Sequence, residues 1–273
     1  MNDADDLLRH CIAAAEAGAR VLREKFEGPL RIEHKGRIDL VTDADRAAEE
    51  AVLEVLGERA PGVAVLAEES GAHGSSEPRL RFIVDPLDGT TNYAHGIPIY
   101  ACTVAAEARG EVLAGCTVDP SRGERFRAAK GNGAFLGQVG SAIDGERRLC
   151  TSSPASLAHA LVCTGFPYDK RERLAELLAM WERFTVRAQG TRRFGSAALD
   201  LAYVAAGRLD GFWESNLKAW DVAAGELLVG EAGGAVTRFD GSAHDLFGGE
   251  IAAASKALLP QLLAVIAEPM APR

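Results

Sequence analysis

Apolar residues recur every three to four positions over residues 3–26, the spacing of one buried face of an α-helix. Shorter apolar runs bounded by Gly, Pro or Asp have the length and composition of strands. Helices are predicted over 3–26, from Thr42 to about Arg59, over 174–184, from Ser196 to Gly207, and over 222–232 and 258–267. Strands are predicted over 63–67, 80–84, 99–107, 112–118, 160–164, 209–213, 235–239 and 251–254.

This alternation of strands and helices predicts a layered α/β architecture. A length of 273 residues fits one domain spanning residues 1–273. Residues 137–156 are rich in Gly, Ser and charge, so we expect the chain there to pass from an N-terminal half, about 1–145, to a C-terminal half, about 150–273.

Two carboxylates stand three residues apart directly after the predicted strand over 80–84, in the stretch Asp85-Pro86-Leu87-Asp88-Gly89-Thr90-Thr91-Asn92-Tyr93. Gly89 allows the backbone to approach a ligand closely, and Thr90 adds a hydroxyl beside it. Hard oxygen ligands at the end of a strand suit Mg²⁺, with a substrate phosphate completing its coordination shell. The alternative is a turn in which both aspartates only accept hydrogen bonds from backbone amides.

Composition and charge restrict the class of protein. Hydrophobic residues at 47% and charged residues at 25% are typical of a globular domain. A net charge of -9 argues against broad nucleic-acid binding, which needs a basic face. Five cysteines without a C-x-x-C pair are typical of reduced thiols, the start of the chain is acidic, and no 18-residue apolar run is present. We therefore expect a cytoplasmic protein with no membrane partner.

Five separated segments place a carboxylate near a strand end or a helix start: Asp45, Glu68, Asp85 with Asp88, Glu214, and Asp221. Each has a structural alternative. Asp45 can cap a helix together with Thr42, Asp221 can be an N-cap, and Glu68 and Glu214 can be solvated surface residues. Taken together, they suit metal-assisted phosphoryl transfer to water. The sequence lacks the G-x-x-x-x-G-K-[ST], G-x-G-x-x-G, H-E-x-x-H and G-x-S-x-G motifs of competing chemistries, and Asp85-x-x-Asp88 is not the D-x-D of aspartyl-phosphate enzymes.

The stretch from Asp85 to Tyr93 resembles the signature of the inositol monophosphatase family. The D-x-V-T-x-x-D element from Asp39 to Asp45, the loop Glu68-Glu69-Ser70 and the element from Trp220 to Gly234 resemble the family in the same order. This resemblance covers residues 35 to 234. It implies an alternating α-β-α-β-α sandwich, a homodimer, and a lithium-sensitive phosphatase holding two or three Mg²⁺ ions per site.

The resemblance also implies the metal ligands. Glu68, Asp85 and the backbone carbonyl of Leu87 would hold the first Mg²⁺, which activates the attacking water. Asp85, Asp88 and Asp221 would hold the second Mg²⁺, near the leaving-group oxygen.

The remaining implied roles concern water and substrate. Thr90 and Asp45 would orient the attacking water, and the backbone N–H groups of Gly89 and Thr90 would bind phosphate. Glu214 would accept hydrogen bonds from ring hydroxyls, and Asp88 and Asp221 would also face the substrate. The segment formed by Gly195, Ser196 and Ala197 would line the polyol pocket, and Lys35 would balance the acidic cluster. The spacing from Lys35 to Asp39 is one residue shorter than in animal members of the family.

These observations predict a Mg²⁺-dependent phosphomonoesterase acting on inositol 1-phosphate or a related polyol or sugar phosphate. A histidinol-phosphate, fructose-1,6-bisphosphate or 3′-phosphonucleotide phosphatase is the alternative within the superfamily, and Glu214 favours a polyol because a carboxylate suits vicinal hydroxyls. The alternative of another class is a non-enzymatic regulatory or RNA-associated protein on the same scaffold. The complete set of carboxylates and the acidic net charge argue against it.

Overall fold

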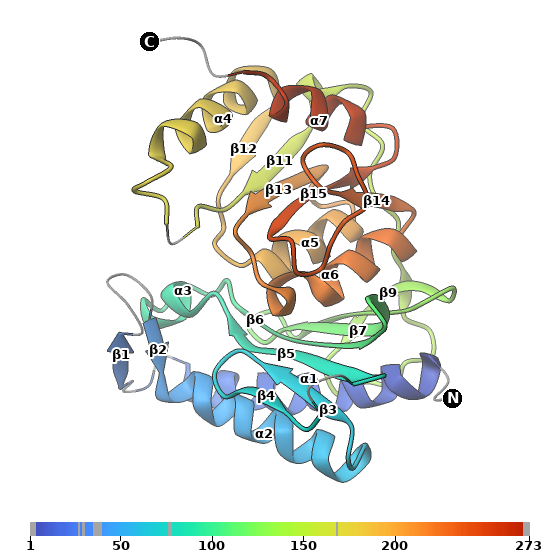
Figure 1. Cartoon of the computed structure of the whole chain (residues 1–273). Helices are drawn as coiled ribbons and strands as arrows, with labels where there is room; N and C mark the ends of the chain where they lie inside the picture. The colour runs from blue at the N-terminus through green and yellow to red at the C-terminus, as the bar shows by residue number, and fades with distance from the viewer. Residues whose placement is uncertain are drawn as a thin grey trace.

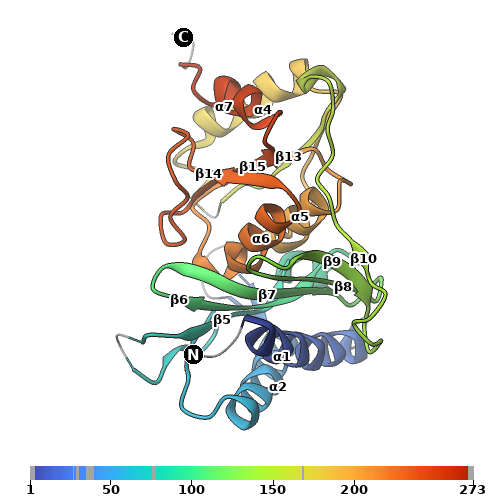
Figure 2. The ribbon, with the colours of Figure 1, turned by 90° about the vertical axis from the view of Figure 1, so that its right-hand side faces the viewer.

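A computed structural model describes residues 4–26, 28, 31–34, 40–75, 78–167 and 169–269. Helices and sheets alternate in five layers (Figures 1 and 2), which confirms the predicted α-β-α-β-α sandwich. Lys35 and Asp39 lie outside the described residues. No helix in the described ranges combines the length and the apolar character needed to cross a membrane.

The outer layer of the N-terminal half consists of α1 (Ala4–Lys25) and α2 (Asp43–Arg59). The apolar face predicted for the first helix is buried, including Leu7, Cys11 and Leu22. Helix α2 begins with the predicted cap, because Thr42 accepts a hydrogen bond from the Ala44 amide while Asp45 accepts one from the Thr42 amide. Both helices pack on one face of the first sheet.

The first sheet has eight strands in the order β10-β9-β8-β7-β6-β5-β3-β4. Its strands are β3 (Ala64–Ala67), β4 (Gly71–His73), β5 (Arg81–Asp88), β6 (Ala101–Ala108), β7 (Glu111–Asp119), β8 (Glu124–Ala129), β9 (Gly133–Gln138) and β10 (Arg147–Arg148). A separate two-stranded ribbon pairs β1 (Ile32–His34) with β2 (Leu40–Thr42), and the short α3 (Thr90–Ala94) follows β5. Strand β10 belongs to this sheet, so the chain leaves the first sheet only after Arg148.

The central layer consists of α5 (Ala197–Ala205) and α6 (Ala219–Glu231), which lie between the two sheets. A Cβ atom at Gly115 of β7 would stand 2.9 Å from the Cα atom of Ala224, so only glycine permits this close approach of α6. Ile83 of the first sheet and Phe212 of the second belong to the same buried cluster as these helices. The two halves therefore share a continuous core.

The second sheet has the order β12-β11-β13-β15-β14 and is covered on its outer face by two helices. Its strands are β11 (Leu161–Thr164), β12 (Gly190–Arg192), β13 (Gly211–Ser215), β14 (Gly234–Thr237) and β15 (Glu250–Ser255), its helices α4 (Leu174–Arg187) and α7 (Leu259–Ile266), and η1 (Leu157–His159) precedes β11. Strands β12, β11 and β13 are parallel, so their carboxyl ends meet at one edge.

Two differences from the sequence prediction concern the site. Strand β5 was expected to end at Val84, with both aspartates in a turn, but it continues to Asp88. Strand β12 was not predicted, because the three residues Gly190–Arg192 contain no apolar side chain and gain their strand conformation only by pairing with β11.

Candidate active site

A cleft of about 610 Å³ lies where the carboxyl end of β5 faces the second sheet and the first turn of α6. Its lining residues come from both halves of the chain: Glu68, Asp85, Leu87, Asp88, Gly89, Thr90, Thr91, Gly165, Phe166, Pro167, Lys170, Arg193, Gly195, Ser196, Ala197, Glu214, Asn216, Leu217, Lys218, Trp220 and Asp221. A larger and shallower hollow of about 970 Å³ beside α2 shares only Glu68 with this cleft. We place the candidate site in the smaller cleft because the clustered carboxylates lie there.

An irregularity in β5 brings Asp85 and Asp88 to the same side of the strand. Side chains three residues apart on a regular strand point to opposite faces. Here Asp85 pairs with Thr103 and Asp88 with Ala101, so three steps on β5 correspond to two on β6. β5 therefore has one residue more than β6 over this stretch, beside Pro86, which has no amide N–H to donate to a neighbouring strand. The extra residue brings the side chains of Asp85 and Asp88 to the same face of the sheet.

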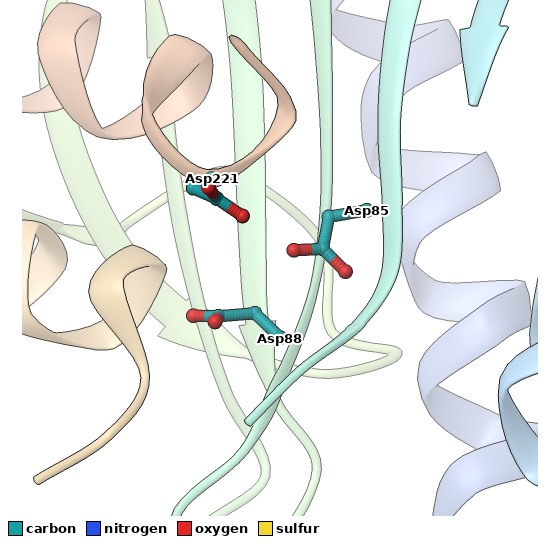
Figure 3. Close-up of side chains that lie close together, drawn as sticks. All are labelled: Asp85, Asp88 and Asp221. Atoms are coloured by element: carbon teal, nitrogen blue, oxygen red, sulfur yellow. The ribbon is translucent and has the colours of Figure 1, made fainter. Parts of the chain in front are cut away.

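Asp221 completes the cluster from the first turn of α6 (Figure 3). One carboxylate oxygen each from Asp85, Asp88 and Asp221 lie within 4.8 Å of one another. The expectation that Asp221 could be an N-cap is wrong. The N-cap is Lys218, and Asp221, three residues into the helix, accepts a 2.6 Å hydrogen bond from the Lys218 amide. The same carboxyl group therefore caps the helix and reaches the cleft.

Hydrogen bonds fix the other two carboxyl groups. Asp85 accepts from the Leu87 amide at 3.0 Å, and Asp88 accepts from the Ser196 hydroxyl at 2.6 Å and the Ala198 amide at 2.7 Å. The turn-type hydrogen bonds of the alternative interpretation are thus present, but the side chains also converge with Asp221. The bond to Ser196 ties β5 to the N-terminus of α5 in the other half.

The cluster carries negative charge that its protein surroundings do not neutralise. Burial, followed by the charges of Glu68, Asp88 and Asp221, raises the pKa of Asp85 well above its usual range. Burial also raises the pKa of Asp88 to about 6, against the opposing hydrogen bond from Ser196. The pKa of Asp221 is raised by burial and then by Asp88 and Glu68. A bound cation would relieve this repulsion, and an all-oxygen donor set fits Mg²⁺.

Glu68 and Asp45 approach this cluster from two further elements. The Glu68 amide, just after β3, donates to the Val84 carbonyl at 3.1 Å, which holds Glu68 beside the end of β5. It is half-buried rather than part of a solvated face. The Thr90 hydroxyl lies 3.0 Å from Asp45 Oδ1 and 3.0 Å from the Leu87 carbonyl. Asp45 therefore caps α2 and also contacts a residue that lines the cleft.

Gly89 shapes the turn between β5 and α3. Its φ of 93° lies in the left-handed region, and an added Cβ would stand 2.9 Å from the Ile99 carbonyl oxygen and 3.3 Å from that of Gly195. Asn92 donates hydrogen bonds to the Ile99 and Phe194 carbonyls, each at 2.8 Å. This bridge holds the Gly195 segment against the Gly89 turn. Sequence reasoning quoted Asn92 within the motif but assigned it no role.

Glu214 lines the other end of the cleft from the carboxyl end of β13. The expectation of a surface glutamate is wrong, because Glu214 is only 9% exposed. A Cβ at Gly165 would lie 2.1 Å from both carboxylate oxygens, so glycine makes room for this side chain. Burial and the charge of Asp200 raise the pKa of Glu214 to about 8, and Arg193 opposes the shift.

Sequence reasoning missed the cleft residues that follow β11 and β12, among them Gly165, Lys170 and Arg193. The available signal was the position of these residues after two parallel strands, whose carboxyl ends form ligand sites in open α/β sheets. For Arg193 this signal could not be used, because β12 was not predicted. The role proposed for Lys35 stays a prediction, since Lys35 lies outside the described residues.

Comparison with known proteins is consistent across sequence and structure. Residues 3–270 match the profile of the inositol monophosphatase family. The inositol-1-monophosphatase of Mesorhizobium japonicum is 40% identical over 262 residues, covering 96% of each chain. The Nus factor SuhB of Pasteurella multocida is 37% identical over 259 residues, covering 94% of each chain. The crystal structure of the extragenic suppressor protein suhB from Bartonella henselae superposes with a TM-score of 0.87 at 39% identity, covering 94% of this chain and 96% of that one.

Proposed function

The chain belongs to the inositol monophosphatase family, and from this premise we propose that it hydrolyses inositol 1-phosphate or a related polyol or sugar phosphate with Mg²⁺ as cofactor. Membership confirms the predicted family and the predicted enzyme class, a phosphoric monoester hydrolase. The substrate, the metal and the role of each residue belong to the proposal.

The observation that carries the proposal is the convergence of Asp85, Asp88 and Asp221 in a cleft large enough for a sugar phosphate. These carboxylates, with Glu68 and the Leu87 carbonyl, would hold Mg²⁺. When bound, Mg²⁺ would supply Lewis-acid polarisation of the phosphoryl group and a lowered pKa for the attacking water. The raised carboxyl pKa values support this assignment, because they arise from burial and then from repulsion among the proposed ligands, and a bound cation would offset both.

Asp45 and Thr90 would position the attacking water. With Asp45 accepting the Thr90 proton, Thr90 Oγ1 would be left to accept one hydrogen of that water, and Thr90 lines the cleft. Hydrogen bonds from Thr42 to the other Asp45 oxygen keep the carboxylate from rotating away. The pair would thus orient the water and take up its proton.

Glu214 and the Gly195–Ala197 segment would bind the leaving group. A carboxylate at the far end of the cleft can accept hydrogen bonds from two adjacent hydroxyls of a polyol. The Asn92 bridge fixes the distance between this segment and the Gly89 turn, where phosphate would bind. This arrangement favours a hydroxyl-rich leaving group over the cationic leaving group of histidinol phosphate.

The test is a panel of phosphate monoesters with purified protein and Mg²⁺: inositol 1-phosphate, histidinol phosphate, fructose 1,6-bisphosphate and a 3′-phosphonucleotide, compared by kcat/KM. The proposal expects inositol 1-phosphate or another polyol or sugar phosphate to rank first. A preference for histidinol phosphate or the nucleotide would move the chain to another branch of the superfamily. We also propose that the protein forms a homodimer, is inhibited by lithium and is located in the cytoplasm.

The relatives named Nus factor SuhB raise a second candidate, a regulatory role beside or instead of catalysis. The proposed ligands Glu68, Asp85, Asp88 and Asp221 all line one cleft, as a working catalytic centre requires. A chain that binds Mg²⁺ but hydrolyses none of the esters would favour the regulatory role.

A further inference from the structure

A further hollow of about 500 Å³ lies beside the segment that leads into α6. Leu66 of β3 and Arg81 of β5 line it from the first sheet, and Phe247 lines it from the loop before β15. Four of its residues also line the catalytic cleft: Asn216, Leu217, Lys218 and Trp220. The hollow and the cleft are therefore neighbours that share one wall.

The rim of this hollow presents an aromatic ring to solvent. Phe247 is 53% exposed, although the chain around it is fixed. Its amide donates to the Asp245 carboxylate at 3.0 Å, and the Gly249 carbonyl accepts from the Leu217 amide at 3.1 Å. Leu246, the residue before Phe247, is buried in the core between the two sheets. About half of the ring surface is thus left open beside the hollow by an ordered loop.

Two cations stand next to this apolar surface. The Arg81 Cζ atom lies 4.9 Å from the centroid of the Phe247 ring, and Arg81 Nε donates to the buried Glu107 carboxylate at 2.5 Å. These contacts hold the guanidinium in place and use only one of its nitrogen atoms. Lys218 is exposed, and within the described ranges only its backbone amide has a partner, Asp221. Glu107 balances Arg81, so the charge of Lys218 is the one left unneutralised.

We propose that this hollow binds a small aromatic monoanion, such as an aryl carboxylate. The flat apolar body would pack on Phe247 and Trp220, and the carboxylate would accept hydrogen bonds from the Lys218 ammonium and the Arg81 guanidinium. A volume of about 500 Å³ is sufficient for a ligand of this kind. Inorganic phosphate has no apolar part to cover the exposed ring, so the site should discriminate against it.

Occupation of the hollow should affect catalysis through the shared wall, and this consequence alone rests on the proposed function. Lys218 lines both spaces, so an anion in the hollow would compete with the substrate phosphate for its ammonium group. The carboxylate cluster would keep its own contacts. We therefore expect the ligand to raise KM for inositol 1-phosphate and to leave kcat unchanged.

The binding test is isothermal titration calorimetry in Mg²⁺ buffer with naphthoate, its neutral amide naphthamide, and inorganic phosphate. Wild type should bind naphthoate, bind naphthamide roughly two- to fivefold more weakly, and show no competition by inorganic phosphate. Phe247→Ala should weaken naphthoate binding roughly three- to tenfold, the size of one aromatic contact. Lys218→Gln should reduce the preference for the acid over the amide. Val186→Ala, which removes an exposed apolar side chain from α4, is the matched control and should change nothing.

The kinetic test measures KM and kcat for inositol 1-phosphate as naphthoate is added. KM should rise roughly two- to fivefold and then level off, the size of one exposed charge pair, and the naphthoate concentration needed should increase in Phe247→Ala. A KM that rises without limit, equally in wild type and Phe247→Ala, would place naphthoate in the cleft and overturn the proposal.

The site would also be overturned if wild type bound no naphthoate, bound the amide as tightly as the acid, or lost no affinity in Phe247→Ala. If wild type binds no naphthoate and Phe247→Ala converts a dimer to a monomer, a second copy of the chain covers the hollow instead. Hydrolysis of no ester in the panel would overturn the proposed function, whereas calorimetry would still decide whether the site exists.

Discussion

We expect Glu214→Gln to make the fold more stable and the enzyme less active. Glu214 is 9% exposed, its carboxyl group lies against Gly165, and burial raises its pKa to about 8 from its usual value of 4.5. A carboxyl group with a raised pKa holds a proton in the folded state that the unfolded chain has already lost. Between pH 4.5 and 8 this group therefore makes folding less favourable as pH rises.

The size of this free-energy cost follows from the separation between the folded and unfolded pKa values of Glu214. Each pH unit between the two pKa values costs about 1.36 kcal/mol, so the cost near pH 7 is on the order of 3 kcal/mol. Glutamine has a similar shape and no ionisable group. Glu214→Gln should therefore raise the free energy of unfolding by about 1–3 kcal/mol at pH 7–8 and change it little at pH 5.

Urea unfolding of the metal-free protein, in excess chelator at pH 5 and pH 8, measures both values. Glu182→Gln, the same chemical change at an exposed position on α4, should alter stability by less than about 0.5 kcal/mol at either pH. A Glu214→Gln protein that is destabilised, or whose difference from wild type is the same at pH 5 and pH 8, would refute the reasoning.

The same variant should lose activity. Above pH 8, where Glu214 is ionised and can accept hydrogen bonds from ring hydroxyls, removing its charge should cost about 1.5–3 kcal/mol, or roughly ten- to a hundredfold in kcat/KM for inositol 1-phosphate. Cleavage of an ester whose leaving group lacks hydroxyls should scarcely change. Equal slowing of all esters would place Glu214 among the metal or structural residues instead.

Four further predictions follow from the cleft. Mg²⁺ should raise thermal stability, by about 2.7 kcal/mol at a hundred times its Kd, and an unchanged Tm with added Mg²⁺ would argue against the metal site. Because burial and mutual repulsion raise the pKa values of Asp85 and Asp221, protons compete with Mg²⁺, so calorimetric Mg²⁺ affinity should rise from pH 5.5 to 7.5 rather than stay level. In urea unfolding, Gly89→Ala should lower the free energy of unfolding by more than Gly131→Ala. Both glycines have positive φ, but only at Gly89 would the added Cβ also stand 2.9 Å from a carbonyl oxygen. Equal losses of stability would contradict this. Li⁺ at millimolar concentration should lower turnover at fixed Mg²⁺, and an unaffected rate would reject lithium sensitivity for this chain alone.

Local patterns predicted those parts of the fold that local chemistry determines. The helical spacing of Leu7, Cys11 and Leu22 predicted the buried face of α1, and the pairing of Thr42 with Asp45 predicted the start of α2. Both features depend on residues within a few positions of one another. The resemblance carried by Asp85 to Tyr93 extended the prediction to the five-layer architecture.

Features that depend on distant parts of the chain could not be predicted in this way. The common orientation of Asp85 and Asp88 arises from the register between β5 and β6, and the burial of Glu214 arises from Gly165, 49 residues earlier in the chain. Asp221 was a plausible N-cap in isolation, but the N-cap of α6 is Lys218, three residues earlier. Arg193 drew no attention because its strand, β12, forms only through pairing with β11.

Phosphate release from inositol 1-phosphate, measured across Mg²⁺ concentrations for wild type and Asp85→Asn, tests the central claim most directly. Asp85 is almost fully buried and central to the cluster, so loss of its charge should weaken every proposed metal contact. The account predicts hydrolysis that requires Mg²⁺, vanishes in excess chelator and falls by orders of magnitude in Asp85→Asn. Full activity in chelator, or near-normal turnover by Asp85→Asn, would contradict it.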